Sequence, residues 1–90
     1  MISPAPALTV VLVAWNQLEK TLACLETVSA TTYPSGHILL VDNGSEPPLA
    51  AAVQERFPQV EVLRMERNLG FAGGYTAGLR RAMTSESRLF

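Results

Sequence analysis

The sequence predicts an α/β fold in which parallel strands alternate with helices, and two observations support this prediction. Three apolar runs rich in Val, Ile and Leu are separated by segments whose apolar residues recur with helical spacing. The chain has 90 residues, of which 48% are hydrophobic and 17% charged, so it suits one small domain and not a second core. The expected order, β-α-β-α-β-α, is that of a three-layer, doubly wound, Rossmann-like half domain.

The three expected strands are residues 7–15, 37–42 and 60–65. The first two, "ALTVVLVAW" and "HILLVD", are apolar almost throughout, as in parallel strands that are buried on both faces. The third, "VEVLRM", alternates apolar with charged residues and therefore suits a strand nearer an edge of the sheet.

The first helix is expected to follow the first strand directly. Asn16 with Glu19 three residues later predicts a capping box, and "TYPSG" at 32–36 is expected to end the helix. Cys24 is the only cysteine, which excludes an internal disulfide, and its apolar neighbours predict a small buried thiol.

The second helix is expected at 48–57, and the third from within the glycine-rich segment 67–78 to about Met83. Right-handed crossovers then give parallel strands in the order 3-2-1, with the first two helices on one face and the third on the other. The ending "SESRLF" predicts no fourth strand, so the most apolar strand would lie at an exposed edge. We therefore expect residues 1–90 to be a single partial domain of a larger one, with residues 1–6 flexible.

Charge and hydropathy exclude several kinds of partner. Seven basic and eight acidic residues give a net charge of −1, which offers no reason to expect binding to nucleic acid or to an anionic membrane. The apolar runs are shorter than the ~20 residues that a spanning helix needs, so no transmembrane segment is expected. We predict a cytoplasmic location.

Polar residues and glycines follow each expected strand, at 14–16, 41–45 and 67–74. Because ligands of open parallel sheets bind outside the carboxyl ends of the strands, these segments are the candidate site. Asp42, the only aspartate, could accept hydrogen bonds from a ribose hydroxyl or a base, or could simply form an Asx turn. Trp15 could stack on a base or fill the core.

The glycine-rich segment offers backbone N–H groups at a helix N-terminus, an environment suited to phosphate. It matches neither G-x-G-x-x-G nor the P-loop pattern, so an alternative is that Gly73 and Gly74 only allow close helix–sheet packing. A D-x-D pair is impossible with one aspartate, His37 suits a structural residue better than a ligand or base, and no complete catalytic set is present.

Taken in order, "LTVVLVAWN", "TYPSGHILLVDNGS" and "NLGFAGGYTAGLRRA" resemble the nucleotide-binding part of family 2 glycosyltransferases, which have the GT-A fold. The resemblance covers residues 8–83, is greatest to rhamnosyltransferase-like members, and implies a truncated GT-A fold. It implies that the end of the first strand flanks the base of a nucleotide-sugar, that Asp42 hydrogen-bonds the base, and that the glycine block shapes the pocket. The donor-binding residues that it implies are Ala14, Trp15, Asn16, Asp42, Asn43, Asn68, Gly70, Gly73 and Gly74.

The resemblance further implies transfer of a hexosyl or rhamnosyl group from a nucleotide-diphosphate-sugar to a hydroxyl of a glycan or another acceptor. A divalent cation, Mg²⁺ or Mn²⁺, is expected in the full-length enzyme, where a D-x-D would hold it; that motif and the catalytic base are missing here. The chain is thus expected to have no catalytic residues and to be inactive alone, and Thr76 stands where many members have Asn.

Other interpretations stay open at this point. The chain could be a non-catalytic or degenerate nucleotide-binding module, or half of another doubly wound protein such as a nucleotidyltransferase or a dehydrogenase. The full-length enzyme could also work at the inner face of the membrane. The donor sugar, the base, the acceptor and the oligomeric state are not specified by the sequence.

Overall fold

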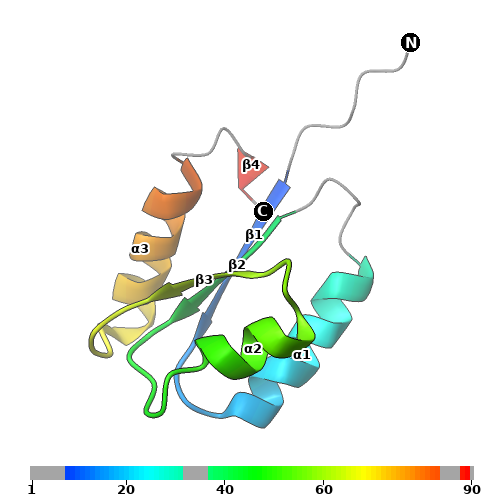
Figure 1. The fold of residues 1–90 in the computed structure, drawn as a ribbon. Coiled ribbons are helices and arrows are strands. Elements are labelled where there is room, and N and C mark those ends of the chain that lie inside the picture. Colours follow the sequence, from blue (N-terminus) through cyan, green and yellow to red (C-terminus); the bar gives the residue numbers. More distant parts are fainter. Residues whose placement is uncertain (1–7, 32–36, 84–87, 90) are drawn as a thin grey trace.

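The computed structural model describes residues 8–31, 37–83 and 88–89, and it has the expected α/β architecture (Figure 1). Strands and helices alternate along the chain, as the apolar pattern predicts. The elements are β1 (Leu8–Ala14), α1 (Leu18–Thr31), β2 (His37–Asp42), α2 (Ala50–Arg56), β3 (Glu61–Arg64), α3 (Gly70–Met83) and β4 (Arg88–Leu89).

The four strands form one parallel sheet in the order β3-β2-β1-β4, which confirms the predicted 3-2-1 order of the first three strands. The register pairs Ala14 with Asp42 and Asp42 with Arg64. The carboxyl ends of β1, β2 and β3 are therefore level, and the loops that follow them start from the same edge of the sheet.

The expectation that there would be no fourth strand is wrong. The short strand β4 lies parallel to β1 and pairs with Leu8 and Thr9. After α3 crosses the face of the sheet, the chain returns beside β1, and two residues are enough to begin a pairing there. β1 is thus an inner strand at its start, which suits its apolar sequence.

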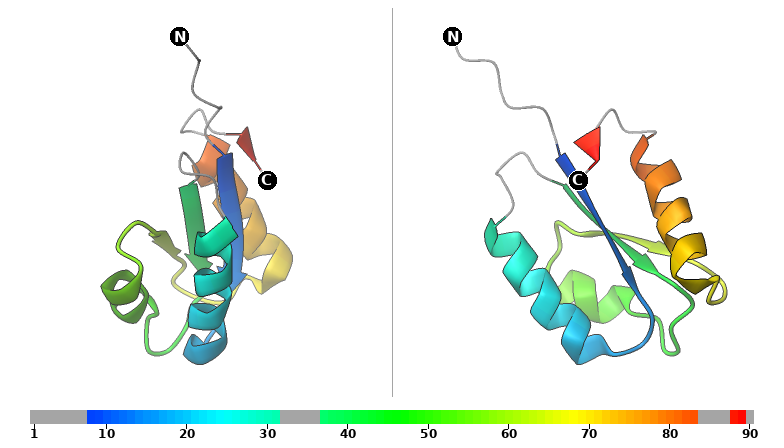
Figure 2. Two further views of the ribbon diagram at one scale, coloured as in Figure 1. Left: turned by 90° about the vertical axis from the view of Figure 1, so that its right-hand side faces the viewer. Right: turned by 180° about the vertical axis from the view of Figure 1, so that it is seen from behind.

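Helices cover both faces of the sheet, as the right-handed crossovers predict (Figure 2). On one face, α1 and α2 contribute Leu25 and Val53 to a core against the strand residues Ile38 and Leu40. On the other face, α3 packs on β1 and β2. That second core consists of Val11, Leu39, Val41 and Ala82.

The helix α3 contacts the sheet through small residues rather than large apolar ones. Gly74, Gly78 and Ala82 are buried, whereas Met83 is 70% exposed. A Cβ atom at Gly78 would lie 2.6 Å from a side-chain atom of Val11. The spacing of four residues puts both glycines on one helix face, and this lets the helix backbone approach the strands.

Two helix starts differ from the prediction. The capping box is wrong: α1 begins at Leu18, because Asn16 and Gln17 have left-handed backbones, with φ of 54° and 50°. The second helix begins at Ala50 and not at 48, two residues past Pro48.

The prediction that the thiol of Cys24 is buried is also wrong, since Cys24 is exposed. It lies two residues after the buried Leu22 and therefore points from a different side of α1. The predictions for residues 1–6 and 32–36 concern segments outside the described residues.

Candidate functional site

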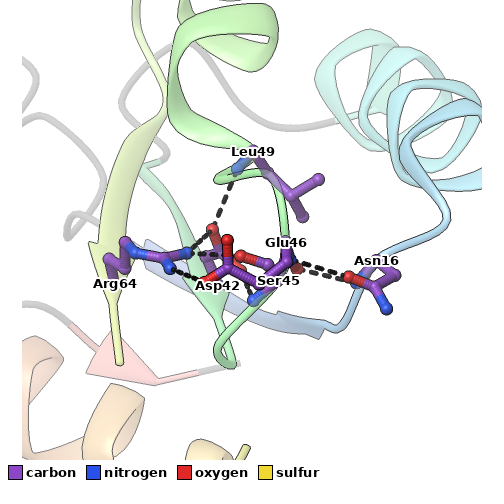
Figure 3. Close-up of polar contacts among 6 residues, drawn as sticks. All are labelled: Asn16, Asp42, Ser45, Glu46, Leu49 and Arg64. Atoms are coloured by element: carbon purple, nitrogen blue, oxygen red, sulfur yellow. Dashed lines mark hydrogen bonds and ion pairs between the residues drawn. The ribbon is translucent and has the colours of Figure 1, made fainter. Parts of the chain in front are cut away.

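The carboxylate of Asp42, at the end of β2, is fully buried and accepts hydrogen bonds on both oxygens (Figure 3). Oδ1 accepts from the backbone N–H of Ser45 at 3.0 Å, and Oδ2 from that of Leu49 at 2.9 Å. The first of these bonds reaches three residues along the chain, one more than the Asx turn with Gly44 that the sequence allowed. Burial alone would raise the pKa of Asp42, but the hydrogen bonds from Leu49, Ser45 and Arg64 outweigh it and lower the pKa.

Arg64, at the end of β3, is the cation that pairs with this carboxylate. Its Nη1 donates to Asp42 Oδ2 at 3.0 Å and to the backbone oxygen of Ser45 at 2.9 Å, while Nη2 contacts Glu46 Oε1 at 3.3 Å. The guanidinium group therefore ties the loop after β2 to the end of β3. Because Asp42 and Arg64 are register partners, the parallel pairing itself brings them together.

The loop after β1 is fastened to the loop after β2 by Asn16. Its backbone N–H donates to Ser45 Oγ at 2.7 Å, and its side-chain Oδ1 accepts from the backbone N–H of Glu46 at 3.0 Å. These bonds suit the left-handed backbone of Asn16, a conformation that asparagine tolerates better than most residues. Asn16 thus joins two strand ends and does not cap α1.

Asn43 fastens the loop after β2 to the start of α3. Its Nδ2 donates to Asn68 Oδ1 at 3.1 Å and to the backbone oxygen of Gly70 at 3.0 Å, and its Oδ1 accepts from the N–H of Leu69 at 3.1 Å. Asn68 Oδ1 also accepts from the N–H of Gly70 at 2.7 Å. The loops that follow β1, β2 and β3 are therefore bonded to one another.

The glycines of these loops have different tasks. Gly44 has a φ of 82°, and a Cβ atom there would lie 2.5 Å from the backbone of Arg67. A Cβ at Gly74 would lie 3.0 Å from both Asn43 and Val13, so Gly74 allows the close packing considered in the sequence. Gly70 has a φ of 76° with open space around it. At Gly73 a Cβ would contact only Leu69, at 2.7 Å.

A hollow of about 480 Å³ lies along β1, between α1 and α3. Ala14, Trp15 and Asn16 line it from the end of β1, Lys20 from α1, and Phe71 and Tyr75 from α3. The rings of Phe71 and Tyr75 stack with their centroids 5.8 Å apart.

Trp15 is 53% exposed, so it does not fill the core, which was one of its two interpretations. The other interpretation, that it stacks on a base, stays a prediction.

The structure thus brings the predicted site residues together in two groups. Ala14, Trp15 and Asn16 face the hollow, whereas Asp42, Asn43, Asn68 and Gly70 belong to the bonded framework beside it. Gly74 packs on Asn43, and Gly73 lies against Leu69 without joining the framework. His37 lies at the opposite end of β2 and bonds to Glu61 at 2.8 Å.

Glu46 and Arg64 lie outside the segments that the sequence indicated, and Ser45 lies within the segment 41–45 without an individual role. Arg64 could have been found, because it ends a strand next to the one that Asp42 ends.

A family model described as Glycosyl transferase family 2 matches residues 9–85. The chain belongs to glycosyltransferase family 2. Its class of chemistry is therefore glycosyl transfer, with a nucleotide-sugar donor and an acceptor as the general partners. A comparison with curated proteins gives no significant match.

Glycosyltransferases of this family generally use divalent cations. Within residues 8–31, 37–83 and 88–89, however, His, Cys, Asp and Glu side chains form no group of three that could hold a metal ion. The described residues do not fit such a cation by themselves. None of the described helices is both long and apolar enough to cross a membrane.

Proposed function

We propose that this glycosyltransferase domain binds the nucleotide part of a nucleotide-diphosphate-sugar at the loops that follow β1, β2 and β3. The sugar, a rhamnosyl or other hexosyl group, would pass to a hydroxyl of a glycan or other acceptor bound elsewhere in the full-length enzyme. The observation that carries the proposal is the bonding of the three loops through Asn16 and Asn43 in a chain of this family. Open parallel sheets bind ligands outside the carboxyl ends of their strands, and the three loops start from that edge of the sheet.

The chemistry of the surrounding groups suits a nucleotide. The half-exposed indole of Trp15 offers a flat apolar surface to a base. Lys20 lines the same hollow and brings a positive charge for a diphosphate. Asn68 lies just before α3, and Gly70, Gly73 and Gly74 lie in its first residues. The first N–H groups of a helix lack partners within the helix.

The chain carries one part of a transferase and not the whole reaction. A base for the acceptor hydroxyl and a D-x-D pair are missing from the sequence, so we expect no sugar transfer by the 90-residue chain. Residues 1–90 are proposed to form one partial domain of the enzyme. A cytoplasmic location is part of the proposal, because a free, exposed thiol at Cys24 suits a reducing compartment.

Calorimetric titration with UDP, dTDP, GDP and NAD tests the proposal. We expect at least one nucleoside diphosphate to bind, and the substitution Trp15→Leu to weaken that binding by about tenfold, the value of a modest stacking contact. Met83→Leu is the matched control, since Met83 is exposed at the far end of α3. No binding of any nucleoside diphosphate would contradict the proposal, and tighter binding of NAD would favour a dehydrogenase-like half.

A further inference from the structure

Exposed aromatic side chains gather around the hollow along β1. Among the residues that the structure describes, Phe57 is a buried aromatic of the core, whereas Trp15, Phe71 and Tyr75 are 53%, 72% and 36% exposed. All three of these exposed rings line the hollow. Single exposed apolar side chains are common on protein surfaces, but a cluster of them around one hollow indicates a site that binds an apolar group.

Phe71 and Tyr75 line the hollow from α3. They are four residues apart and therefore neighbours on the surface of the helix. Their rings stack with 5.8 Å between centroids and 7° between planes, so each ring holds the other in place. The helix packs on the sheet through small residues such as Gly74 and Gly78, and these two rings are not needed for that contact. The stacked pair therefore offers a flat, supported apolar surface to the hollow.

The other wall of the hollow carries both a flat ring and a charge. Helices α1 and α3 lie on either side of β1, and the segment between β1 and α1 brings Trp15 and Gln17 to the hollow (Figure 2). Lys20, in the first turn of α1, is the only charged residue among the described residues that line it. Its positive charge is complementary to a diphosphate. The combination suits a ligand with a flat apolar ring and an attached anionic group, which is the chemistry of a nucleoside diphosphate.

We propose that Phe71 and Tyr75 form the second wall of the base-binding site. The base enters between the indole of Trp15 and the ring of Phe71, and Tyr75 supports Phe71 by stacking on it. This inference rests on the proposed function, since it adds residues of α3 to the same pocket. Every nucleobase has two flat faces, so contacts on both faces strengthen binding without selecting among the bases. Selection among bases then depends on groups that meet the edge of the base.

The experiment compares the wild type with Phe71→Leu and Tyr75→Leu. Met83→Leu is the matched control, because Met83 lies on the same helix, is 70% exposed and does not line the hollow. Each protein is first shown to be folded by circular dichroism, and UDP, dTDP and GDP are then titrated by calorimetry. At saturation with the nucleotide that binds most tightly, proton NMR records the ring C–H proton of its base. This resonance moves upfield when the base lies against the face of an aromatic ring.

We expect Phe71→Leu to weaken the binding of all three nucleotides by about fivefold to tenfold, the effect of losing one stacking contact. Tyr75→Leu removes only the support of Phe71 and should weaken binding by about twofold to fivefold. Phe71→Leu should also reduce the upfield shift of the base proton, because one of two rings is gone. Met83→Leu should match the wild type in both measurements. The shift is measured in the fully bound complex, so a loss of protein stability alone would not change it.

Wild-type affinity and a wild-type base shift in Phe71→Leu, with weaker binding in Trp15→Leu, would overturn the inference and leave the proposed function intact. Sedimentation equilibrium tests whether a second copy of the chain covers the rings instead. A wild-type dimer that Phe71→Leu dissociates, with nucleotide affinity unchanged, would also overturn the inference. If Phe71→Leu does not fold, Tyr75→Leu decides by the same two measurements. If the wild type binds none of the three nucleotides, the proposed function fails and the inference fails with it.

Discussion

Asn43 Nδ2 donates to Asn68 Oδ1 at 3.1 Å, and this bond joins the loop after β2 to the turn that begins α3. The two residues are 25 positions apart in the sequence, and the same Asn43 amide also bonds to Leu69 and Gly70. Every hydrogen-bonding atom of a nearly buried side chain is thereby used at the place where the strand ends meet.

Asn43→Ala should therefore be among the most damaging changes at this edge of the sheet. It removes three hydrogen bonds and leaves the N–H of Leu69 without its partner, so we expect a loss of about 2–3 kcal/mol in the free energy of unfolding. Urea unfolding followed by circular dichroism measures the loss. Equal stability of Asn43→Ala and the wild type would contradict the role given to this amide.

Two glycines with positive φ provide a matched pair for testing whether the loops after β2 and β3 are in close backbone contact. Gly70→Ala adds a methyl group in open space, so only the left-handed backbone opposes it, at a cost of about 1–2 kcal/mol. Gly44→Ala meets the same opposition and also puts Cβ 2.5 Å from the backbone of Arg67 and Asn68. We expect Gly44→Ala to lower the urea midpoint clearly more than Gly70→Ala. Equal losses would mean that the loops are not in close contact at Gly44.

Stability should fall in acid because of Asp42. Burial raises the pKa of this carboxyl group, but hydrogen bonds from Leu49, Ser45 and Arg64 outweigh burial and hold the folded-state pKa below the ordinary value of 3.8. A lowered folded-state pKa stabilises the fold fully above the unfolded-state value, and the stabilisation is lost as the pH falls through the folded-state value. Urea unfolding from neutral pH to below 3.8 should show this decline. Asp42→Asn should have a lower free energy of unfolding at neutral pH than the wild type, and this free energy should fall less as the pH is lowered. An equal fall in both proteins would contradict the assignment of the acid sensitivity to Asp42.

Glu61 joins β3 to two other elements, accepting from His37 of β2 at 2.8 Å and from Arg81 of α3 at 2.6 Å. Since all three side chains are partly exposed, Glu61→Gln should cost no more than about 1 kcal/mol, and less at high salt. Glu26→Gln is the control, because its contact with Arg56 is 3.7 Å long and more exposed. The test is the free energy of unfolding of both variants, measured by urea at low and at high salt. A loss of stability in Glu61→Gln that does not depend on salt would contradict an ionic role for Glu61.

The layers of this fold could be predicted from the sequence because long apolar runs and right-handed crossovers leave little freedom. β4 could not, since two residues are too few to show a period. The capping box failed because a turn made of Asn16 and Gln17 has a left-handed backbone that local patterns do not reveal. Asp42 was found from its place after an apolar strand.

The partners of Asp42 were harder to predict. The contact with Arg64 depends on the register of β2 against β3, and Ser45 needed the turn geometry to be known. The glycines of α3 that face the sheet can be recognised in the sequence, since Gly74 and Gly78 are four residues apart and therefore share a helix face.

The most direct test of the central claim is a map of backbone amide shifts by NMR during titration with UDP, dTDP and GDP. A pocket at the joined strand ends predicts that the largest shifts fall in residues 14–17, 42–46 and 67–74, while the amides of His37 and Glu61, at the opposite ends of β2 and β3, stay unchanged. Shifts confined to the amino ends of the strands, or no saturable shifts with any of the three nucleotides, would contradict the claim.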